Sequence, residues 1–250
     1  MRLIASKLER TIGQGPDGTR WLHRLPSSRP VDRDAELVAL ARGKRVVHVG
    51  FVDEPVMDEK RRLGLWLHDR LAGAAAQLVG IDVDEAGIEA ARREGFEVYA
   101  ADCQSEEALR QLDLPPADVV IAAEVLEHLD APGPFLRAMH VLTAPAGTLV
   151  LTTPSAFRVA NFLGAVLGLE LVHPDHTSWQ SPRTLRTLLE RAGWEIEDVR
   201  WYQMLPTLPA GEPTSARALY AFKRAGSSLL RFFPAFSDGL LVRCRAASDR

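Results

Sequence analysis

The stretch VVHVGFVDEP at residues 46–55 has the pattern of a buried strand that runs into a polar turn. Its β-branched residues favour a strand, and Gly50 stands where that strand would end. A loop whose backbone approaches a ligand closely needs glycine, because glycine has no side chain in the way. Gly50 is the only glycine in the stretch. Three interpretations follow: a modified cofactor loop, a different kind of site, or a buried strand with a polar loop after it.

The composition is that of an ordinary globular protein. The chain has 250 residues, of which 46% are hydrophobic and 25% charged, and its formal net charge is -3. That balance gives no basic excess to hold a phosphate backbone, so a nucleic-acid partner is not expected. Cys103 and Cys244 form neither a disulfide framework nor a metal motif, which favours a reducing, cytoplasmic location. No stretch reaches the roughly 20 apolar residues of a membrane span, so no membrane partner is expected.

Short β-branched runs alternate with amphipathic runs along most of the chain. Strand patterns lie at residues 45–51, 76–83, 96–102, 117–124 and 147–154. Helix patterns lie between them, at residues 57–75, 84–96, 105–112 and 132–142. Strands that alternate with helices form βαβ units, which build a parallel sheet covered on both faces. The sequence therefore predicts an α/β, doubly wound, Rossmann-like fold.

The remaining segments are less regular. Residues 155–181 show no clear period, and a helix pattern at 181–194 and a strand pattern at 195–205 follow them. A Pro-rich loop at 205–213, a helix pattern at 215–233 and a strand pattern at 239–246 complete the chain. We expect a single domain over residues 1–250, with an N-terminal extension at 1–40 that could serve as a lid.

Two acidic residues follow the second and third predicted strands. In doubly wound sheets, ligands bind beyond the carboxyl ends of the strands, where the strand order reverses. There Asp82 can accept both hydroxyl protons of a ribose, and Asp102 can meet the exocyclic amine of an adenine. Alternatively, both residues cap the helices that follow them. Together with Gly50, the two acids favour a nucleoside ligand.

These positions resemble the successive motifs of the class I S-adenosylmethionine-dependent methyltransferases. The resemblance rests on Gly50, Asp82, Asp102 and the segment AAEVLEHLDAPGPFLRAMHVLTAPAGTLVLTTP at 122–154. It implies S-adenosylmethionine as cofactor and a seven-stranded, mostly parallel sheet whose last strand, at 239–246, is antiparallel at or near the edge. The residues that it implies at the cofactor are Val49, Gly50, Phe51, His68, Asp82, Val83, Asp102, Cys103 and Glu124.

Two positions depart from the family pattern in the first loop. His48 stands where the family has an acid, and Val52 stands near the place of a second glycine. The sulfonium cofactor carries no phosphate, so a full pyrophosphate cradle is not required, and we interpret the stretch as a modified cofactor loop. Asp53, Glu54 or His68 could supply the polar contacts of the missing acid. A non-catalytic nucleoside-binding domain is the alternative.

Two carboxylates and an imidazole follow the fourth predicted strand. Glu124, Glu127 and His128 stand at i, i+3 and i+4, so they would project from one face if a helix began near Glu124. Such a set suits a divalent cation. Further candidate ligands lie in the segment after the fifth strand, at His173, Asp175 and His176.

The Glu-x-x-Glu-His run with a later Asp-His pair resembles the metal-dependent O-methyltransferases, including those of ubiquinone biosynthesis and those that methylate ribose 2′-hydroxyls of small RNA. That resemblance implies Mg²⁺ or Mn²⁺ held by Glu124, Glu127, His128 and His176. His173 is then a candidate base, or it shapes its loop. Similar runs occur in metal-free relatives, in which His128 and His176 would act directly as base or hydrogen-bond donor.

The expected reaction is methyl transfer to a hydroxyl of a small molecule, such as a sugar, a glycoside or a secondary metabolite. Methyl transfer to nitrogen or carbon is the alternative within the family. The N-terminal extension and residues 155–181 and 205–236 are expected to face the acceptor, and Trp179 could wall its pocket. The apolar run SSLLRFFPAF at 227–236 fits a helix packed on the sheet, a homodimer contact or a lid over an apolar acceptor.

Overall fold

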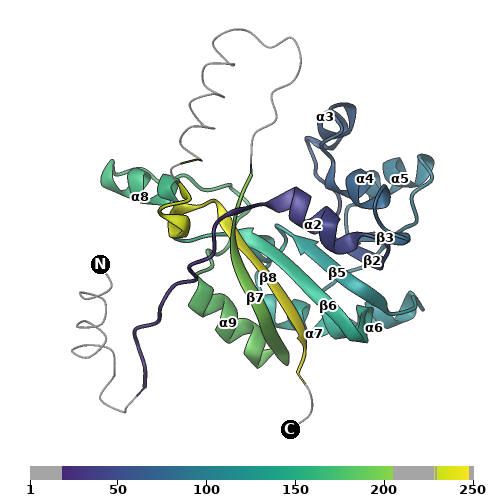
Figure 1. Ribbon diagram of the computed structural model, residues 1–250. Coiled ribbons are helices and arrows are strands. Elements are labelled where there is room, and N and C mark those ends of the chain that lie inside the picture. The colour runs from purple at the N-terminus through teal and green to yellow at the C-terminus, as the bar shows by residue number, and fades with distance from the viewer. Residues whose placement is uncertain (1–18, 205–227, 229, 248–250) are drawn as a thin grey trace.

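A mixed sheet runs through the centre of the molecule, which a computed structural model describes over residues 19–204, 228 and 230–247 (Figure 1). Its strands in this part of the chain lie in the order β1-β7-β8-β6-β5-β2-β3-β4. β8 is antiparallel to both neighbours, and the other pairs are parallel. The strands are β1 Val31–Asp32, β2 Arg45–Val49, β3 Gln77–Asp82, β4 Val98–Ala100, β5 Ala117–Ala123, β6 Thr143–Pro154, β7 Trp194–Gln203 and β8 Gly239–Ala246.

Helices cover both faces of this sheet (Figure 1). One face carries α2 Arg33–Ala41 and α4 Leu67–Ala72, and the other carries α6 Glu106–Gln111, α7 Pro132–Leu142 and α9 Pro182–Arg191. The remaining elements are α3 Met57–Arg62, α5 Glu85–Arg93, α8 Val159–Val166 and the 3-10 turns η1 Leu126–His128 and η2 Pro234–Phe236. The predicted α/β doubly wound fold is confirmed.

Neighbouring residues of the central strands alternate between the two apolar layers, because successive side chains of a strand point to opposite faces. Val46 and Ile121 pack with α2 and α4, whereas Val47 and Val120 pack with the layer that contains α7 and α9. All four side chains are buried. Burying a valine or isoleucine contributes roughly 1.5–3 kcal/mol, so the core fixes the strand ends from which the loops depart.

Polar residues other than the predicted acids begin two of the helices. Asp84 accepts a hydrogen bond from the Gly87 N–H at the start of α5, and Ser105 accepts one from the Ala108 N–H at the start of α6. Such side chains satisfy N–H groups that the first turn leaves free. The alternative that Asp82 and Asp102 cap these helices is therefore wrong.

The five strands predicted over residues 45–154 are confirmed as β2 to β6, and other expectations need correction. β8 lies between β6 and β7 and not near the edge, because this position pairs both of its backbone edges and buries its apolar side chains. The helix predicted over 57–75 is split at Gly64, whose φ is 67°. Part of the irregular segment 155–181 forms α8.

The N-terminal extension also ends earlier than predicted. β1 pairs with β7, and α2 buries Leu37 and Ala41 in the core, so residues 31–41 belong to the folded domain. β1 also brings the strands of the described sheet to eight, where the sequence predicts seven. The predicted Pro-rich loop at 205–213 and most of the helix predicted at 215–233 lie outside the described residues.

Candidate active site

A cavity of about 920 Å³ lies beyond the carboxyl ends of β2, β3, β5 and β6. The strand order reverses between β2 and β5, which is where doubly wound sheets bind ligands. Pockets for small molecules measure about 300–1,000 Å³, so this one has room for a nucleoside cofactor and a second small molecule. Of the residues predicted at the cofactor, all except His68 line the cavity.

Gly50 ends β2 in a conformation that favours glycine. Its φ is 67°, and a Cβ atom at this position would lie 2.4 Å from Val125 Cγ2. Its N–H donates to the carbonyl oxygen of Ile81 at 2.9 Å. The chain therefore turns directly against Val125, and the ends of β2, β3 and β5 meet at the cavity.

Asp82 fastens the loop after β2 to the end of β3. Its Oδ2 accepts from the Val52 N–H at 2.9 Å, and its Oδ1 accepts from the N–H groups of Val83 and Asp84 at 2.7 and 3.1 Å. A carboxylate offers about four acceptor positions, and these bonds use three of them. As placed, Asp82 can accept one ribose hydroxyl, where the sequence predicts two.

Asp102 and Cys103 follow β4 along the same rim. Asp102 is exposed, and its Oδ1 accepts from the Gln104 N–H at 2.9 Å. Burial, with the nearby carboxylates of Asp82 and Asp102, raises the pKa of the Cys103 thiol to about 12. The Cys103 thiol, which lines the cavity, is therefore neutral at pH 7. The Asp102 carboxylate is an accessible acceptor for the hydrogen bond of an amine.

Two stacked histidines occupy the place where the family resemblance implies an acid. The Nδ1 atoms of His48 and His68 lie 3.1 Å apart, so the N–H of one ring donates a hydrogen bond to the nitrogen of the other. Burial lowers the pKa of His68 to about 3, and burial with the charges of His68 and Arg33 lowers the pKa of His48 well below its usual value. Both rings are therefore neutral at pH 7. His68 lies behind His48, and Asp53 and Glu54 line the cavity instead.

Arg33 is a cavity residue that the sequence analysis did not identify. Its Nε donates to Asp34 Oδ1 at 2.8 Å, and its Nη1 lies 3.9 Å from Glu124 Oε1. Burial opposes its charge, but the carboxylates of Glu124 and Asp34 outweigh that effect and raise the pKa of Arg33. No motif marks this arginine; it reaches the cavity because α2 packs beside β5.

Glu124 is held by neighbours from β6 and β7. Its Oε1 accepts from the hydroxyl groups of Tyr202 at 2.7 Å and Thr152 at 2.9 Å. Its φ of 58° is unusual for a residue with a side chain, and that conformation prevents a helix from beginning here. The chain forms only the short η1, so the helical face on which the predicted i, i+3, i+4 set depends is not formed.

Glu127, His128 and His176 meet at the other end of the cavity, where one ligand atom from each lies within 4.8 Å of the others. Glu127 is fully buried, and its Oε2 accepts from the Thr153 hydroxyl at 3.0 Å. Within the described structure, Glu127 Oε1 and His176 Nδ1 are buried without a hydrogen-bond partner, a costly arrangement that a bound cation would relieve. Burial, and next the Glu124 carboxylate, raise the pKa of Glu127 to about 9. Glu124 is not a member of this group.

The loop that carries His176 is fastened to η1. The Thr177 N–H donates to the carbonyl oxygen of Glu127 at 2.7 Å, and its hydroxyl donates to that of Leu129 at 2.8 Å. His173 lies in the same loop, but its Nδ1 accepts from the Asp175 N–H at 3.3 Å. That bond occupies the lone pair of Nδ1 and leaves the proton on Nε2, so His173 as placed is not ready to act as a base.

Trp179 lies behind the wall of the cavity. It is absent from the lining, but its ring lies 5.9 Å from that of His176 and 4.9 Å from the Cζ atom of Arg158. Arg158 does line the cavity. Trp179 therefore supports two lining residues and does not itself form the wall of the pocket that the sequence offered as one possibility.

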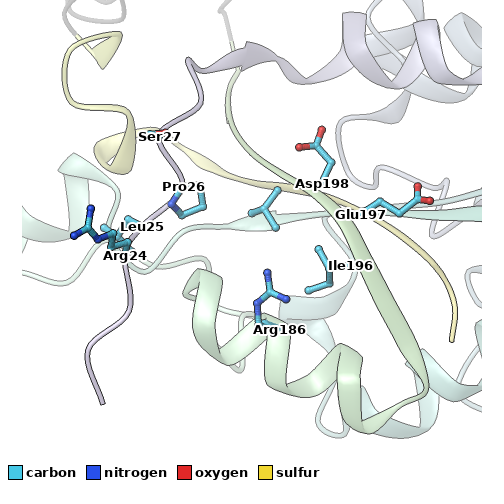
Figure 2. Close-up of a pocket in the computed structure, with 9 residues that line it drawn as sticks. Arg24, Leu25, Pro26, Ser27, Arg186, Ile196, Glu197 and Asp198 are labelled. Carbon is cyan, nitrogen blue, oxygen red and sulfur yellow. The ribbon is translucent and has the colours of Figure 1, made fainter. Parts of the chain in front are cut away.

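A second groove, of about 630 Å³, lies between residues 24–27, β7 and α9 (Figure 2). The Trp201 Nε1–H donates to the carbonyl oxygen of Pro26 at 2.8 Å, which fixes this segment against β7. None of the residues predicted to bind the cofactor or a metal lines the groove. Residues 24–27 thus lie away from the cavity that the extension was expected to cover, and residues 1–18 are outside the described part.

The sequence profile of a family described as "Methyltransferase domain" matches residues 35–199. The chain belongs to this family. The methyltransferase domain is 31% identical over 143 residues to a ubiquinone biosynthesis O-methyltransferase from Pseudomonas aeruginosa, a match that covers 53% of this chain and 61% of that protein. It is 32% identical over 132 residues to a probable S-adenosylmethionine-dependent methyltransferase from Mycolicibacterium smegmatis, covering 52% and 48%. The matches thus span about half to three fifths of these relatives.

Solved structures share the fold of the methyltransferase domain at low sequence identity. A TehB-like S-adenosylmethionine-dependent methyltransferase from Corynebacterium glutamicum is 15% identical with a TM-score of 0.52, covering 86% of this chain and 88% of its own. A magnesium protoporphyrin IX methyltransferase from Synechocystis, solved with S-adenosylhomocysteine, is 15% identical with a TM-score of 0.53, covering 86% and 82%.

In the described residues of the methyltransferase domain, every helix is too short or too polar to cross a bilayer.

Proposed function

We propose that this methyltransferase domain transfers the methyl group of S-adenosylmethionine to a hydroxyl of a small molecule. One observation carries the proposal: a single cavity joins Asp82 and Asp102 to Glu127 and His176. A nucleoside at the first end and a hydroxyl at the second would be neighbours, and alignment of two reactants supplies much of the rate of such a transfer. The name of the Pseudomonas relative favours oxygen as the acceptor atom.

The cofactor end offers a partner for each part of S-adenosylmethionine. In this proposal Asp82 accepts a ribose hydroxyl and Asp102 accepts from the adenine amine. Arg33, which lines the same cavity, supplies a positive charge for the carboxylate of the methionine part. His48 is neutral, so the role that an acid has in the family falls to Asp53 or Glu54 of the loop.

Glu127, His128 and His176 would hold a divalent cation at the acceptor end. A carboxylate with two imidazoles suits Mn²⁺ better than Mg²⁺, which prefers oxygen ligands. Such an ion, when bound, lowers the pKa of a hydroxyl that it contacts. Burial, with the neighbouring His128 and His173, lowers the pKa of His176, so its ring is neutral at pH 7 and can take the proton of the hydroxyl where no ion is bound.

Binding and turnover test the proposal separately. Calorimetry should show that S-adenosylhomocysteine binds and NAD does not, and binding of NAD alone would overturn methyl transfer. Labelled S-adenosylmethionine should then be incubated with sugars, amino sugars, glycosides and phenols. Products methylated on nitrogen or carbon alone would overturn the choice of a hydroxyl. Loss of turnover in EDTA with recovery in Mn²⁺ supports the cation, whereas full turnover in EDTA rejects it and leaves His128 and His176 as base or donor.

A further inference from the structure

Arg158 brings a positive charge to the acceptor end of the cavity. It directly precedes α8 and lines the cavity together with His173, Asp175 and His176. Its guanidinium donates to two neutral groups: Nε to Asn161 Oδ1 at 2.9 Å, and Nη2 to the carbonyl oxygen of Leu171 at 3.0 Å. These bonds use two of the five N–H donors of an arginine and leave three for a ligand.

Carboxylates near Arg158 are engaged elsewhere. Asp175 is exposed and lies beside His173, with 3.7 Å between its Oδ2 and His173 Nδ1. Asp238 Oδ2 accepts from the Met204 N–H at 2.9 Å. Within the described residues, no carboxylate oxygen lies within 4.0 Å of the Arg158 nitrogens. Arg33, at the cofactor end, is by contrast paired with Asp34 and lies close to Glu124.

The guanidinium of Arg158 is also held in position. Its Cζ atom lies 4.9 Å above the centre of the Trp179 ring, a stacking that stabilises a cation and keeps the planar fork in one orientation. A fixed fork with free N–H groups matches the two oxygens of a carboxylate or phosphate, and it loses little conformational entropy when it binds them. With a neutral sugar bound, this charge would have no directly paired carboxylate among the described residues, because Asp238 interacts with it only from beyond 4.0 Å.

We propose that Arg158 binds an oxyanion of the methyl acceptor, a carboxylate or a phosphate, close to the hydroxyl that is methylated. The inference rests on the proposed function, because it takes the end of the cavity at His176 as the acceptor site. It narrows the acceptor from any small hydroxyl compound to an acidic one.

The test is calorimetric titration of the S-adenosylhomocysteine complex with three matched probes. These are 4-hydroxybenzoate, 4-hydroxyphenyl phosphate and the neutral 4-hydroxybenzamide. At least one anionic probe should bind about tenfold more tightly than the amide, because an ionised acceptor strengthens the hydrogen bonds of a guanidinium. The anion that binds more tightly shows whether the site prefers a carboxylate or a phosphate. Arg158→Gln should abolish the preference, and Arg158→Lys should retain part of it.

Arg186→Gln is the control, because Arg186 lines the second groove and not the cavity (Figure 2). This variant should keep the full preference. Equal binding of all three probes to the wild-type protein, no binding of the anions, or a preference that survives in Arg158→Gln would each overturn the proposal. If Arg158→Gln does not fold, Arg158→Lys tests the proposal instead. This variant keeps the charge but lacks the planar fork, so its preference for the anionic probes should be smaller than that of the wild type. Failure of S-adenosylhomocysteine to bind the wild type would instead count against the proposed function.

Discussion

The two ends of the cavity are built in different ways. At the cofactor end, the acids Asp82 and Asp102 come from neighbouring strand ends and accept from backbone N–H groups, three of them in the case of Asp82. At the acceptor end, they come from segments far apart in the chain, which side chains join. Thr177 reaches Glu127 across 50 residues. Beyond this end, α8 buries none of its residues, and its Phe162 side chain is 58% exposed.

This difference indicates a functional division between the two ends of the cavity: one binds the cofactor, and the other selects the acceptor. A site made of strand ends is fixed by the core, so it suits a ligand that stays the same. A site made of loops and an exposed helix can change without disturbing the core, so it suits the part that selects the acceptor. If the division holds, substitutions at one end should leave the property of the other end unchanged. The following predictions test it, beginning with the largest expected effect.

His176→Ala should reduce methyl transfer by about 10²–10⁴-fold, the usual contribution of a proton-transfer or metal-activated group. His176 is a partly exposed loop residue, so the fold and the affinity for S-adenosylhomocysteine should change little. Turnover and calorimetry on the same preparation measure both. His173→Ala is the matched control and should lose much less activity, because His173 Nδ1 accepts from a backbone N–H. A variant that binds the cofactor poorly would contradict the division.

Asp82→Ala should weaken binding of S-adenosylhomocysteine by about 2–4 kcal/mol. The variant loses one charge-assisted bond to the ribose, and the loop after β2 loses the acceptor for its Val52 N–H. Calorimetry measures the affinity. Ser105→Ala is the control, because Ser105 caps α6 and does not line the cavity, so its loss should cost only about 1 kcal/mol of stability with affinity largely kept. Wild-type affinity in a folded Asp82→Ala protein would remove Asp82 from the site.

Acid should lower the free energy of unfolding through the buried pair of His48 and His68 beside the cofactor end. The pKa of His68 is about 3 in the folded protein, and an unfolded histidine has a pKa near 6.5. As the pH falls, the unfolded chain therefore takes up the proton first. The contribution of His68 to the free energy of unfolding is present above pH 6.5 and is lost as the pH falls toward 3. Between pH 7 and pH 5 the loss is about 2 kcal/mol.

Urea unfolding of the wild type and of His68→Phe at pH 7 and pH 5 measures this contribution. The difference between the two proteins should shift by about 2 kcal/mol, because the variant lacks the group. Glu127, whose pKa is raised by burial, acts in the opposite direction in both proteins and cancels in the comparison. Parallel pH curves for the two proteins would show that His68 is not neutral by burial.

Tyr202→Phe should lower stability by about 1 kcal/mol, because it removes one hydrogen bond to the Glu124 carboxylate while Thr152 still donates to it. Thermal unfolding measures the loss. Tyr99→Phe is the matched control: its hydroxyl donates to Glu97 on the surface, so its removal should have almost no effect. Equal effects of the two substitutions would mean that β7 does not hold Glu124.

The sequence by itself determined the strands β2 to β6 and the acids at their ends. Each strand is a short local run of β-branched residues, and parallel strands place their carboxyl ends along one edge of the sheet. Gly50, Asp82 and Asp102 could therefore be assigned to one rim before any contact was known. The same reasoning failed for the helical face expected to carry Glu124, Glu127 and His128, because the positive φ of Glu124 prevents a helix from beginning there.

The tertiary structure decided the features that rest on contacts between distant segments. β8 lies inside the sheet, where it pairs with β6 and β7. Arg33 reaches the cavity through the packing of α2, and Arg158 is oriented by Trp179, 21 positions further along the chain. His48 meets His68 across 20 residues. No local periodicity encodes such pairs, because each depends on the way in which whole elements pack around the sheet.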